Sequence, residues 1–518
     1  MRDLRMDSTN LYVRDLTQTF IDSVVIESVQ DVTRRWHTPE RAAEEPVIRR
    51  DRPWEHVTYF TYSNYAVLRD GEDGLLKCWY EDLEIPAKRD RIDHYARQLY
   101  AESEDGIHWR KPELDVLEID GRRTNIVLGG GDYGEVHSAS YVIDPHPAQR
   151  DLKFRTLYSH MWDDGKAHRN RIECAHSRDG IHWTRYEEFP RFGMSGPRLN
   201  DVSVLFYDED AHEFVQNTRH FLQWAGAINL RNPHTASFLG PLEPHNPLTY
   251  NQRRVWQTRS HDFLHWSELV PAAATDEEDN LDEFYYGMAQ FRLGSVYLAT
   301  VGVLRAVDNE MDVQLLLSRD GIRWSNTNKR QPFLAPRGEG HWDAHMVSLV
   351  SPPIEMGDKL YFFHGGTSSH HDWWIYPGGI AGELPPCDRL ENVAYGLGLA
   401  TLRKDGYAGL YANRQREGTV VTRALISLGT KLVINARCAP GGSIVVEIAD
   451  RRDEAIAPCT RENCDPFRGD SVAHTVTWKG DALVPAGRER HYWRKVRFFL
   501  RDAELFSFRF AEEGEEAG

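Results

Sequence analysis

A seven-residue turn recurs along the chain and limits what it can fold into more than any other feature. The pattern Ser-X-Asp-Gly-Ile-X-Trp occurs at 103–109, 177–183 and 318–324, with a variant at 260–266 and a degenerate copy at 403–407. Asp-Gly supplies the positive-φ pair of a tight hairpin, and the Ser and Asp side chains can bind turn amides. The four tryptophans are 74, 83 and 58 residues apart, about one four-stranded sheet each. Such spacing is typical of propellers and repeat arrays.

Each turn lies between segments that read as strands. The innermost strand of each set is expected at 62–69, 136–143, 202–207, 284–291 and 344–350. Five sets of strands predict an all-β, five-bladed β-propeller over residues 51–413, with residues 1–50 as an N-terminal extension packing on it. After residue 413 longer alternating strands without the turn predict a C-terminal β-sandwich over 414–518.

Composition excludes several classes of partner. A net charge of −17 argues against a nucleic-acid partner or an anionic membrane surface, since both require a basic face. The longest apolar stretch, 295–304, is too short to span a bilayer. The N-terminal residues show no signal-peptide pattern, so we expect a cytoplasmic protein, or a secreted one if a leader has been removed. The six cysteines form no CxxC pair, and free thiols are expected.

Several short motifs stand out beside the repeated turns. They are Phe20-Ile-Asp-Ser, Arg52-Pro-Trp-Glu55, Lys77-Cys-Trp-Tyr80, Ile143-Asp-Pro145, Phe363-His-Gly-Gly366 and Cys464-Asp-Pro-Phe-Arg-Gly-Asp470. On these motifs and the repeated turns, the chain resembles the β-fructosidase/arabinanase-like superfamily of five-bladed propeller glycosidases (families 32 and 43), and within it an under-characterised bacterial group close to family 32. It lacks the Trp-Met-Asn-Asp-Pro-Asn-Gly and Arg-Asp-Pro motifs of family 32, and the pair Glu173-Cys174 falls in the third strand of a blade.

The resemblance implies glycoside hydrolysis in a central funnel, which needs two carboxylates across the scissile bond. It assigns a nucleophile or base, a pKa-modulating carboxylate and an acid to the first three blades, which map loosely onto Glu55, Glu135 and Asp201. Asp201, Glu283 and Asp343 follow polar or aromatic neighbours at strand starts, and our reading makes these three the core constellation. A solvated loop carboxylate is the alternative at every position. The catalytic candidates are therefore Asp201, Glu283, Asp343, Glu135 and Glu55.

Other residues near the expected funnel could bind sugar hydroxyls or stack on a sugar ring, although packing between blades is the alternative for the aromatic ones. We expect no cofactor and no metal. A divalent metal held by His364, His370 or His371 with a carboxylate stays open. The substrate-binding candidates are Trp54, His56, His137, Asn200, Asp282, Tyr285, His341, Trp342 and His364.

The leading hypothesis is an exo-acting glycoside hydrolase on a terminal sugar, with a furanoside among the options, because the segments 223–252 and 368–391 could wall the funnel into a pocket. The expected partner is an oligosaccharide or glycoside, and a homo-oligomer stays open. One alternative is a carbohydrate-binding propeller without catalysis. Another is a metal-dependent lyase or a phosphorylase that uses histidines of the fifth blade.

Overall fold

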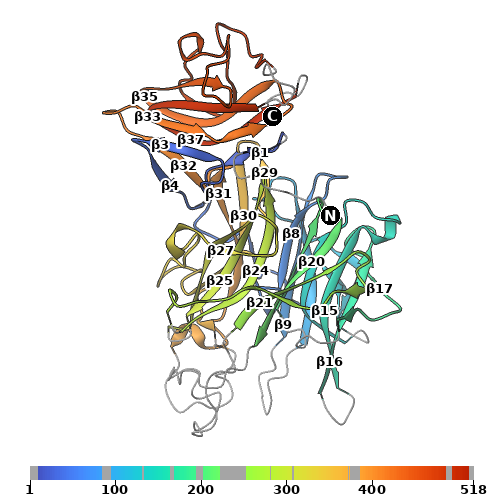
Figure 1. Cartoon of the computed structure of the whole chain (residues 1–518). Helices are drawn as coiled ribbons and strands as arrows, with labels where there is room; N and C mark the ends of the chain where they lie inside the picture. Colours follow the sequence, from blue (N-terminus) through green and yellow to red (C-terminus); the bar gives the residue numbers. More distant parts are fainter. Residues whose placement is uncertain are drawn as a thin grey trace.

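The described part of the chain contains strands and short 3-10 turns but no α-helix, so the all-β prediction is confirmed. The computed structural model describes residues 10–13, 15–84, 95–130, 134–163, 168–193, 202–221, 253–280, 282–305, 308–371, 373, 385–485 and 493–512. Two bodies stand one above the other, a large lower one and a smaller upper one formed by the C-terminal strands (Figure 1). Within the described ranges, no helix has the length and apolarity needed to cross a membrane.

The lower body consists of successive antiparallel sheets, here numbered one to five in chain order. Sheets four and five are joined by a single residue pair, Met311 with Met346. Strands β5 (Glu40–Arg41) and β6 (Ile48–Arg49) add the outer edge of sheet five. Sheet one holds β7 (Val57–Thr58), β8 (Tyr65–Arg69), β9 (Leu76–Glu84), β10 (Tyr95–Ser103) and β13 (Ile126–Leu128); sheet two β14 (Glu135–Ile143), β15 (Phe154–Asp163), β16 (His168–Ser177) and β17 (Thr184–Arg185); sheet three β19 (Ser203–Asp208), β20 (Glu213–Phe221), β21 (Arg253–Ser260) and β23 (Val270–Ala273); sheet four β24 (Glu283–Leu293), β25 (Val296–Arg305), β26 (Glu310–Ser318) and β27 (Ser325–Asn326); sheet five β28 (Met346–Ser348), β30 (Lys359–Thr367) and β31 (Tyr395–Arg403).

The repeated turn is held by its own side chains, as the sequence predicts. Ser103 Oγ accepts a hydrogen bond from the Gly106 amide at 2.9 Å, and Asp105 Oδ1 accepts from the amides of Ile107 and His108 at 2.8 Å each. These bonds, with one from the His108 ring, hold the pKa of Asp105 below its ordinary value. The prediction that both Asp105 and Gly106 have positive φ is wrong in one respect. Of these two residues only Gly106 has a positive φ, at 76°. The hydrogen bonds of the Asp105 side chain therefore stabilise the turn in place of a second residue with positive φ.

The turn tryptophans connect each sheet to the one before it. Trp183 of sheet two lies edge-on to Trp79 of sheet one, with ring centroids 6.4 Å apart. Trp266 joins the apolar cluster between sheets two and three, and Trp324 joins the cluster between sheets three and four. Trp109 of sheet one packs edge-on against Phe363 of sheet five at 5.6 Å. The first sheet thus contacts the last, in addition to each contacting its neighbour in sequence.

Residues 59–64, here called the central loop, interrupt the inner edge of sheet one and reach the other sheets. Tyr62 is fully buried, and its ring lies so close to Gly287 and Gly302 of sheet four that a Cβ at either glycine would overlap it. Ser63 Oγ exchanges hydrogen bonds with the backbone of Ser203 in sheet three. The loop also meets sheets two and five, through Asn64 with Ser138 and through the Phe60 carbonyl beside Gly365. It therefore fills the middle of the lower body.

Gly302→Ala should lower the free energy of unfolding by about 1–3 kcal/mol, because the new methyl group overpacks the Tyr62 ring and the Met311 sulfur. Urea unfolding followed by tryptophan fluorescence measures the difference. Gly71→Ala is the matched control, since a Cβ at that position meets no atom within 4 Å, and it should change stability by less than about 0.5 kcal/mol. Equal effects for the two variants would contradict tight packing around the central loop.

The upper body combines strands from both ends of the chain. Strands β35 (Lys431–Ala449) and β37 (Trp493–Ala511) pair along most of their length. Their neighbours include the N-terminal strands, so residues 10–36 pair with the C-terminal strands while residues 40–49 pair with sheet five. Buried side chains such as Leu432, Phe498 and Phe508 form one apolar core, and all six cysteines of the chain are free thiols. The other strands are β1 (Asn10–Tyr12), β2 (Gln18–Thr19), β3 (Ile26–Gln30), β4 (Thr33–Trp36), β32 (Ala408–Ala412), β33 (Gly418–Thr422), β34 (Ala424–Ile426) and β36 (Asp470–Thr475).

Candidate functional site

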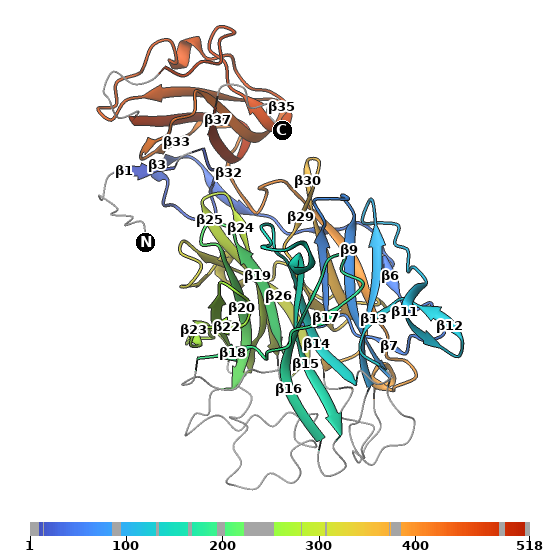
Figure 2. The ribbon, with the colours of Figure 1, turned by 90° about the vertical axis from the view of Figure 1, so that its right-hand side faces the viewer.

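The inner strands of the lower body all begin at the end that faces away from the upper body. Glu135, the first residue of β14, pairs with Met161 near the end of β15, and β15 and β16 run to the lower end of the larger body in Figure 2. Glu283 opens β24 in the same way. This lower end therefore gathers the starts of the inner strands and is the candidate site.

Two carboxylates, those of Glu283 and Asp312, lie at the lower end of sheet four and are here called the carboxylate group. Arg305 contacts Glu283 through Nε at 3.3 Å and Asp312 through Nη1 at 2.6 Å. Burial raises the pKa of Asp312 to about 6, despite the nearby Arg305 cation. Within the described part of the chain, Asp312 Oδ1 is buried without a hydrogen-bond partner. One arginine thus holds two carboxylates, and burial raises the pKa of one of them.

Asp312 is a residue that the sequence analysis missed. It lies within β26, not at the start of an inner strand, and the search of strand entry points passed over it. A signal exists, because Asp312 is the only acidic residue in the apolar run Met311-Asp-Val-Gln-Leu-Leu-Leu317. A carboxylate in a strand that is otherwise apolar is expensive to bury, and such residues often carry function.

Aromatic and basic side chains border this carboxylate group. The Arg219 guanidinium lies over the Tyr286 ring, 4.7 Å from its centroid, and His371 meets the same ring edge-on at 5.0 Å. Tyr286 also neighbours Tyr62 of the central loop at 6.2 Å. The Asp312 charge acts on the buried Tyr62 phenol, whose pKa is raised well above its ordinary value, mainly by burial. The carboxylate group therefore lies against the central loop.

A histidine cluster continues the site toward sheet five. His345 Nδ1 lies 2.9 Å from Glu310 Oε1, and Glu310 stands directly opposite Arg305 in the β25–β26 register. The His345 and His370 rings stack with centroids 4.0 Å apart. Cys387 Sγ lies 3.9 Å from His370 Nδ1. The histidine cluster therefore adjoins the carboxylate group, because Glu310 contacts His345 and is the register partner of Arg305.

Sheet two contributes Glu135 and His137 to the same end. Glu135 is half-buried, and His137 binds Glu81 of β9 through Nδ1 at 2.7 Å. The fully buried Glu81 also accepts from the Ser138 amide and from Asn64 Nδ2, at 2.7 and 2.8 Å. Sequence reasoning named His137 but missed Glu81, since a mid-strand glutamate after a Trp-Tyr pair gives no local sign of its partners.

Glu55 lies in a closed ion pair. Its side chain has no exposed surface, and Lys111 Nζ contacts both oxygens at 2.7 and 2.9 Å. The Tyr80 hydroxyl and the amide of Asp51 supply further hydrogen bonds at 2.6 and 2.8 Å. The neighbouring Trp54 is also buried and donates to Asn125. The structure thus gives the predicted catalytic Glu55 the surroundings of a structural anion.

Asp343 is likewise enclosed, between two arginines. Arg41 Nε and Arg337 Nε lie 2.7 and 2.6 Å from its two oxygens, and the carboxylate has no exposed surface. Burial alone would raise its pKa, but His364, Arg337 and Arg41 outweigh that effect and hold the pKa of Asp343 well below its ordinary value. His364 is itself buried and stacks on Trp342 at 5.5 Å. Arg41 comes from β5, on the outer edge of sheet five.

The remaining predicted residues are dispersed. Tyr285 is buried and donates to Asn326 Oδ1 at 2.9 Å, and burial raises the pKa of this tyrosine to about 12. His56 is half-exposed beside Asp82, with Nδ1 3.3 Å from Oδ2. Asp282 is half-buried beside Glu283, and His341 is exposed. Asp201 and Asn200 lie outside the described residues.

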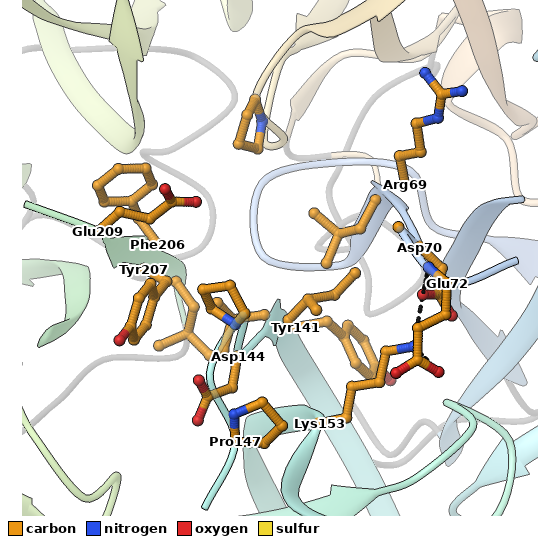
Figure 3. A pocket seen from close by; sticks show the side chains of 17 residues that line it. Arg69, Asp70, Glu72, Tyr141, Asp144, Pro147, Lys153, Phe206, Tyr207 and Glu209 are labelled. Atoms are coloured by element: carbon orange, nitrogen blue, oxygen red, sulfur yellow. Dashed lines mark hydrogen bonds and ion pairs between the residues drawn. The ribbon is translucent and has the colours of Figure 1, made fainter. Parts of the chain in front are cut away.

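A cavity of about 520 Å³ opens at the opposite end of the lower body, where β8, β14 and β19 end (Figure 3). Tyr207 and Phe206 line one side, while Lys153 lies at the other, 2.6 Å from Asp70 and 3.0 Å from Glu72. The nine residues of β14 put its ends about 26 Å apart, at roughly 3.3 Å per residue. This cavity is therefore separate from the lower-end carboxylates.

Fold and site together define an all-β protein with clustered carboxylates and histidines at one end of its larger body. No protein-family model matches the chain, and no curated protein does either.

Solved structures align over most of their own length but at low similarity. An N-acetylgalactosamine deacetylase from F. plautii is 14% identical, covers 72% of this chain and 96% of its own, and has a TM-score of 0.43. A putative glycoside hydrolase from Bacteroides ovatus is 14% identical over 76% of this chain and 97% of its own, with a TM-score of 0.40. A structure described under the GH130 family of mannoside phosphorylases is 13% identical over 71% and 94%, with a TM-score of 0.42. Similarity at this level does not assign a function.

Proposed function

We propose that the chain is a glycoside hydrolase whose lower body is a five-bladed β-propeller and whose upper body is a β-sandwich. The observation that carries this proposal is the pair Glu283 and Asp312 on one arginine at the lower end. Glycosidases need one carboxyl that donates a proton and one carboxylate that attacks or activates water. The raised pKa of Asp312 suits the donor, and Glu283, paired with Arg305, suits the nucleophile or base.

Groups around this pair suit a sugar ligand. Glu135, Asp282 and His137 lie at the starts of inner strands, where carboxylates and an imidazole can bind hydroxyl groups. Tyr286 offers an aromatic face beside Arg219. Asp201 and Asn200 stay in the proposal as further candidates from the start of sheet three. Glu55 and Asp343 are left out, because their ion pairs leave no exposed oxygen.

The direct test is hydrolysis of a panel of p-nitrophenyl furanosides and pyranosides, together with short oligosaccharides. Release of one terminal sugar, lost in both Glu283→Gln and Asp312→Asn, would support an exo-acting hydrolase and would identify the sugar. Activity that requires inorganic phosphate would indicate a phosphorylase instead. Saturable sugar binding without cleavage of any member of the panel would overturn the proposal in favour of a carbohydrate-binding protein.

The rate of hydrolysis should fall as pH rises above about 6. The proton donor must be protonated, and Asp312 loses its proton near that pH because its pKa is raised to about 6. A pH profile of kcat between pH 4 and 9 checks this. In Asp312→Asn the residual activity should lose the basic limb. A basic limb that persists in this variant would assign the proton to another group.

A further inference from the structure

We infer that His345, His370 and Cys387 form a binding site for a Zn²⁺-like divalent metal. One potential ligand atom from each residue lies within 4.8 Å of the other two. The three residues come from separate segments: His345 directly precedes β28, His370 follows the end of β30, and Cys387 lies in a 3-10 turn, Pro386–Asp388. All three side chains are half-buried, so an ion could reach them and be partly shielded from water.

The chemistry of the donor set selects the kind of metal. Imidazole nitrogen and thiolate sulfur are the ligands that zinc prefers, whereas calcium and magnesium take oxygen. Zn–N bonds of about 2.0–2.1 Å and Zn–S bonds of about 2.3 Å place tetrahedral ligand atoms about 3.5 Å apart. The observed cluster is somewhat wider. Metal capture would therefore draw the stacked His345 and His370 rings, now 4.0 Å apart, into a new arrangement.

Carboxylates already orient both imidazoles. Glu310 lies 2.9 Å from His345 Nδ1, and the buried Asp388 lies 2.9 Å from His370 Nδ1. Asp388 also accepts the His370 backbone amide at 2.8 Å. A metal-binding histidine donates its other ring N–H to a carboxylate in this way, which fixes the ring and raises its basicity, so this arrangement would require Nε2 of each ring as the metal ligand.

Binding would connect the cluster to the proposed reaction centre. Glu310 faces Arg305 across β25 and β26, and Arg305 holds Glu283 and Asp312. The metal would fix the position of this pair, while hydrolysis by two carboxylates requires no metal. On binding, the Cys387 S–H bond breaks, its proton passes to the solvent and the sulfur lone pair forms the bond to the metal. No oxidation or reduction is involved.

The test uses the full-length protein, stripped with EDTA and dialysed, titrated with Co²⁺ and Zn²⁺ alone. We expect one equivalent of Co²⁺ to give a thiolate-to-cobalt charge-transfer band, and Zn²⁺ to displace it. Cys387→Ser should abolish the band and weaken Zn²⁺ binding at least tenfold. The conservative variant Glu310→Gln should keep the band and weaken Zn²⁺ binding by about 10–100-fold. Cys438→Ser is the control, because that half-buried thiol lies in the upper body, and it should bind like the wild type.

Absence of stoichiometric binding, or a Cys387→Ser variant that gives the same band as the wild type, would overturn the inference. Circular dichroism of each variant separates loss of the site from loss of the fold. The readout needs no substrate, so a failure of the proposed hydrolase activity leaves this result independent. Metal binding without any glycosidase activity would support the site alone.

Discussion

Asp312→Asn should lower kcat by about 10²–10⁴-fold, the usual contribution of a positioned general acid. The substitution keeps the shape of the side chain and removes its proton-donating carboxyl. It should not destabilise the fold. Because the pKa of Asp312 is raised from 3.8 to about 6, the folded state disfavours its charge, and this penalty is fully present above about pH 6. The amide removes that penalty, so the melting temperature at pH 7 should stay the same or rise.

Glu283→Gln should reduce kcat by at least as much, since it removes the partner carboxylate. Single-turnover measurements beside steady-state kinetics separate the chemical step from binding. The matched control is Glu278→Gln, five residues earlier, whose carboxylate is 79% exposed and lies 3.6 Å from Arg330. It should retain wild-type kcat and KM. Wild-type kcat in Asp312→Asn would show that Asp312 takes no part in the reaction. A free energy of unfolding lowered enough to explain the lost activity would show that Asp312 serves the fold.

Lys111→Met should lower the free energy of unfolding by about 3–5 kcal/mol, because it leaves the Glu55 carboxylate buried without its cation. Lys111 is 5% exposed and Glu55 has no exposed surface, so water cannot replace the lost partner. The control is Arg323→Ala, which removes an exposed pair with Asp320 at a similar distance, 2.8 Å. Exposed pairs contribute about 0–1 kcal/mol. Urea unfolding of the two variants measures the contrast.

Glu55→Gln then separates the two readings of this residue. As a structural anion, its loss should lower stability while kcat per folded molecule remains. A thousandfold loss of kcat with unchanged stability would return Glu55 to the catalytic candidates.

The turns and the strand content could be predicted because their causes are local. Each turn is determined by seven consecutive residues, so the hydrogen bonds that Ser103 and Asp105 accept could be predicted from the motif alone. The ion pairs were not predictable, because Arg41 and Asp343 lie 302 positions apart and are brought together by the pairing of β5 with sheet five. Whether a carboxylate at a strand start faces a ligand or an arginine depends on such distant partners.

The N-terminal strands show the same limit. The short, polar strands β3 and β4 show little hydrophobic periodicity. Their pairing depends on which strands of the upper body have an unpaired edge. Asp312 was missed because only strand starts were searched, although its apolar strand carries a signal; the raised pKa itself comes from burial by other strands.

The central loop lies between the two ends of the lower body, the carboxylate end and the end that holds the cavity. Phe60, Tyr62, Ser63 and Asn64 are all at most 3% exposed, so the described central loop presents almost no surface to solvent. If the carboxylate end binds a sugar as proposed, the central loop lies between that sugar and the cavity lined by Phe206 and Tyr207. We therefore expect substitutions that alter binding at one end to leave binding at the other end unchanged.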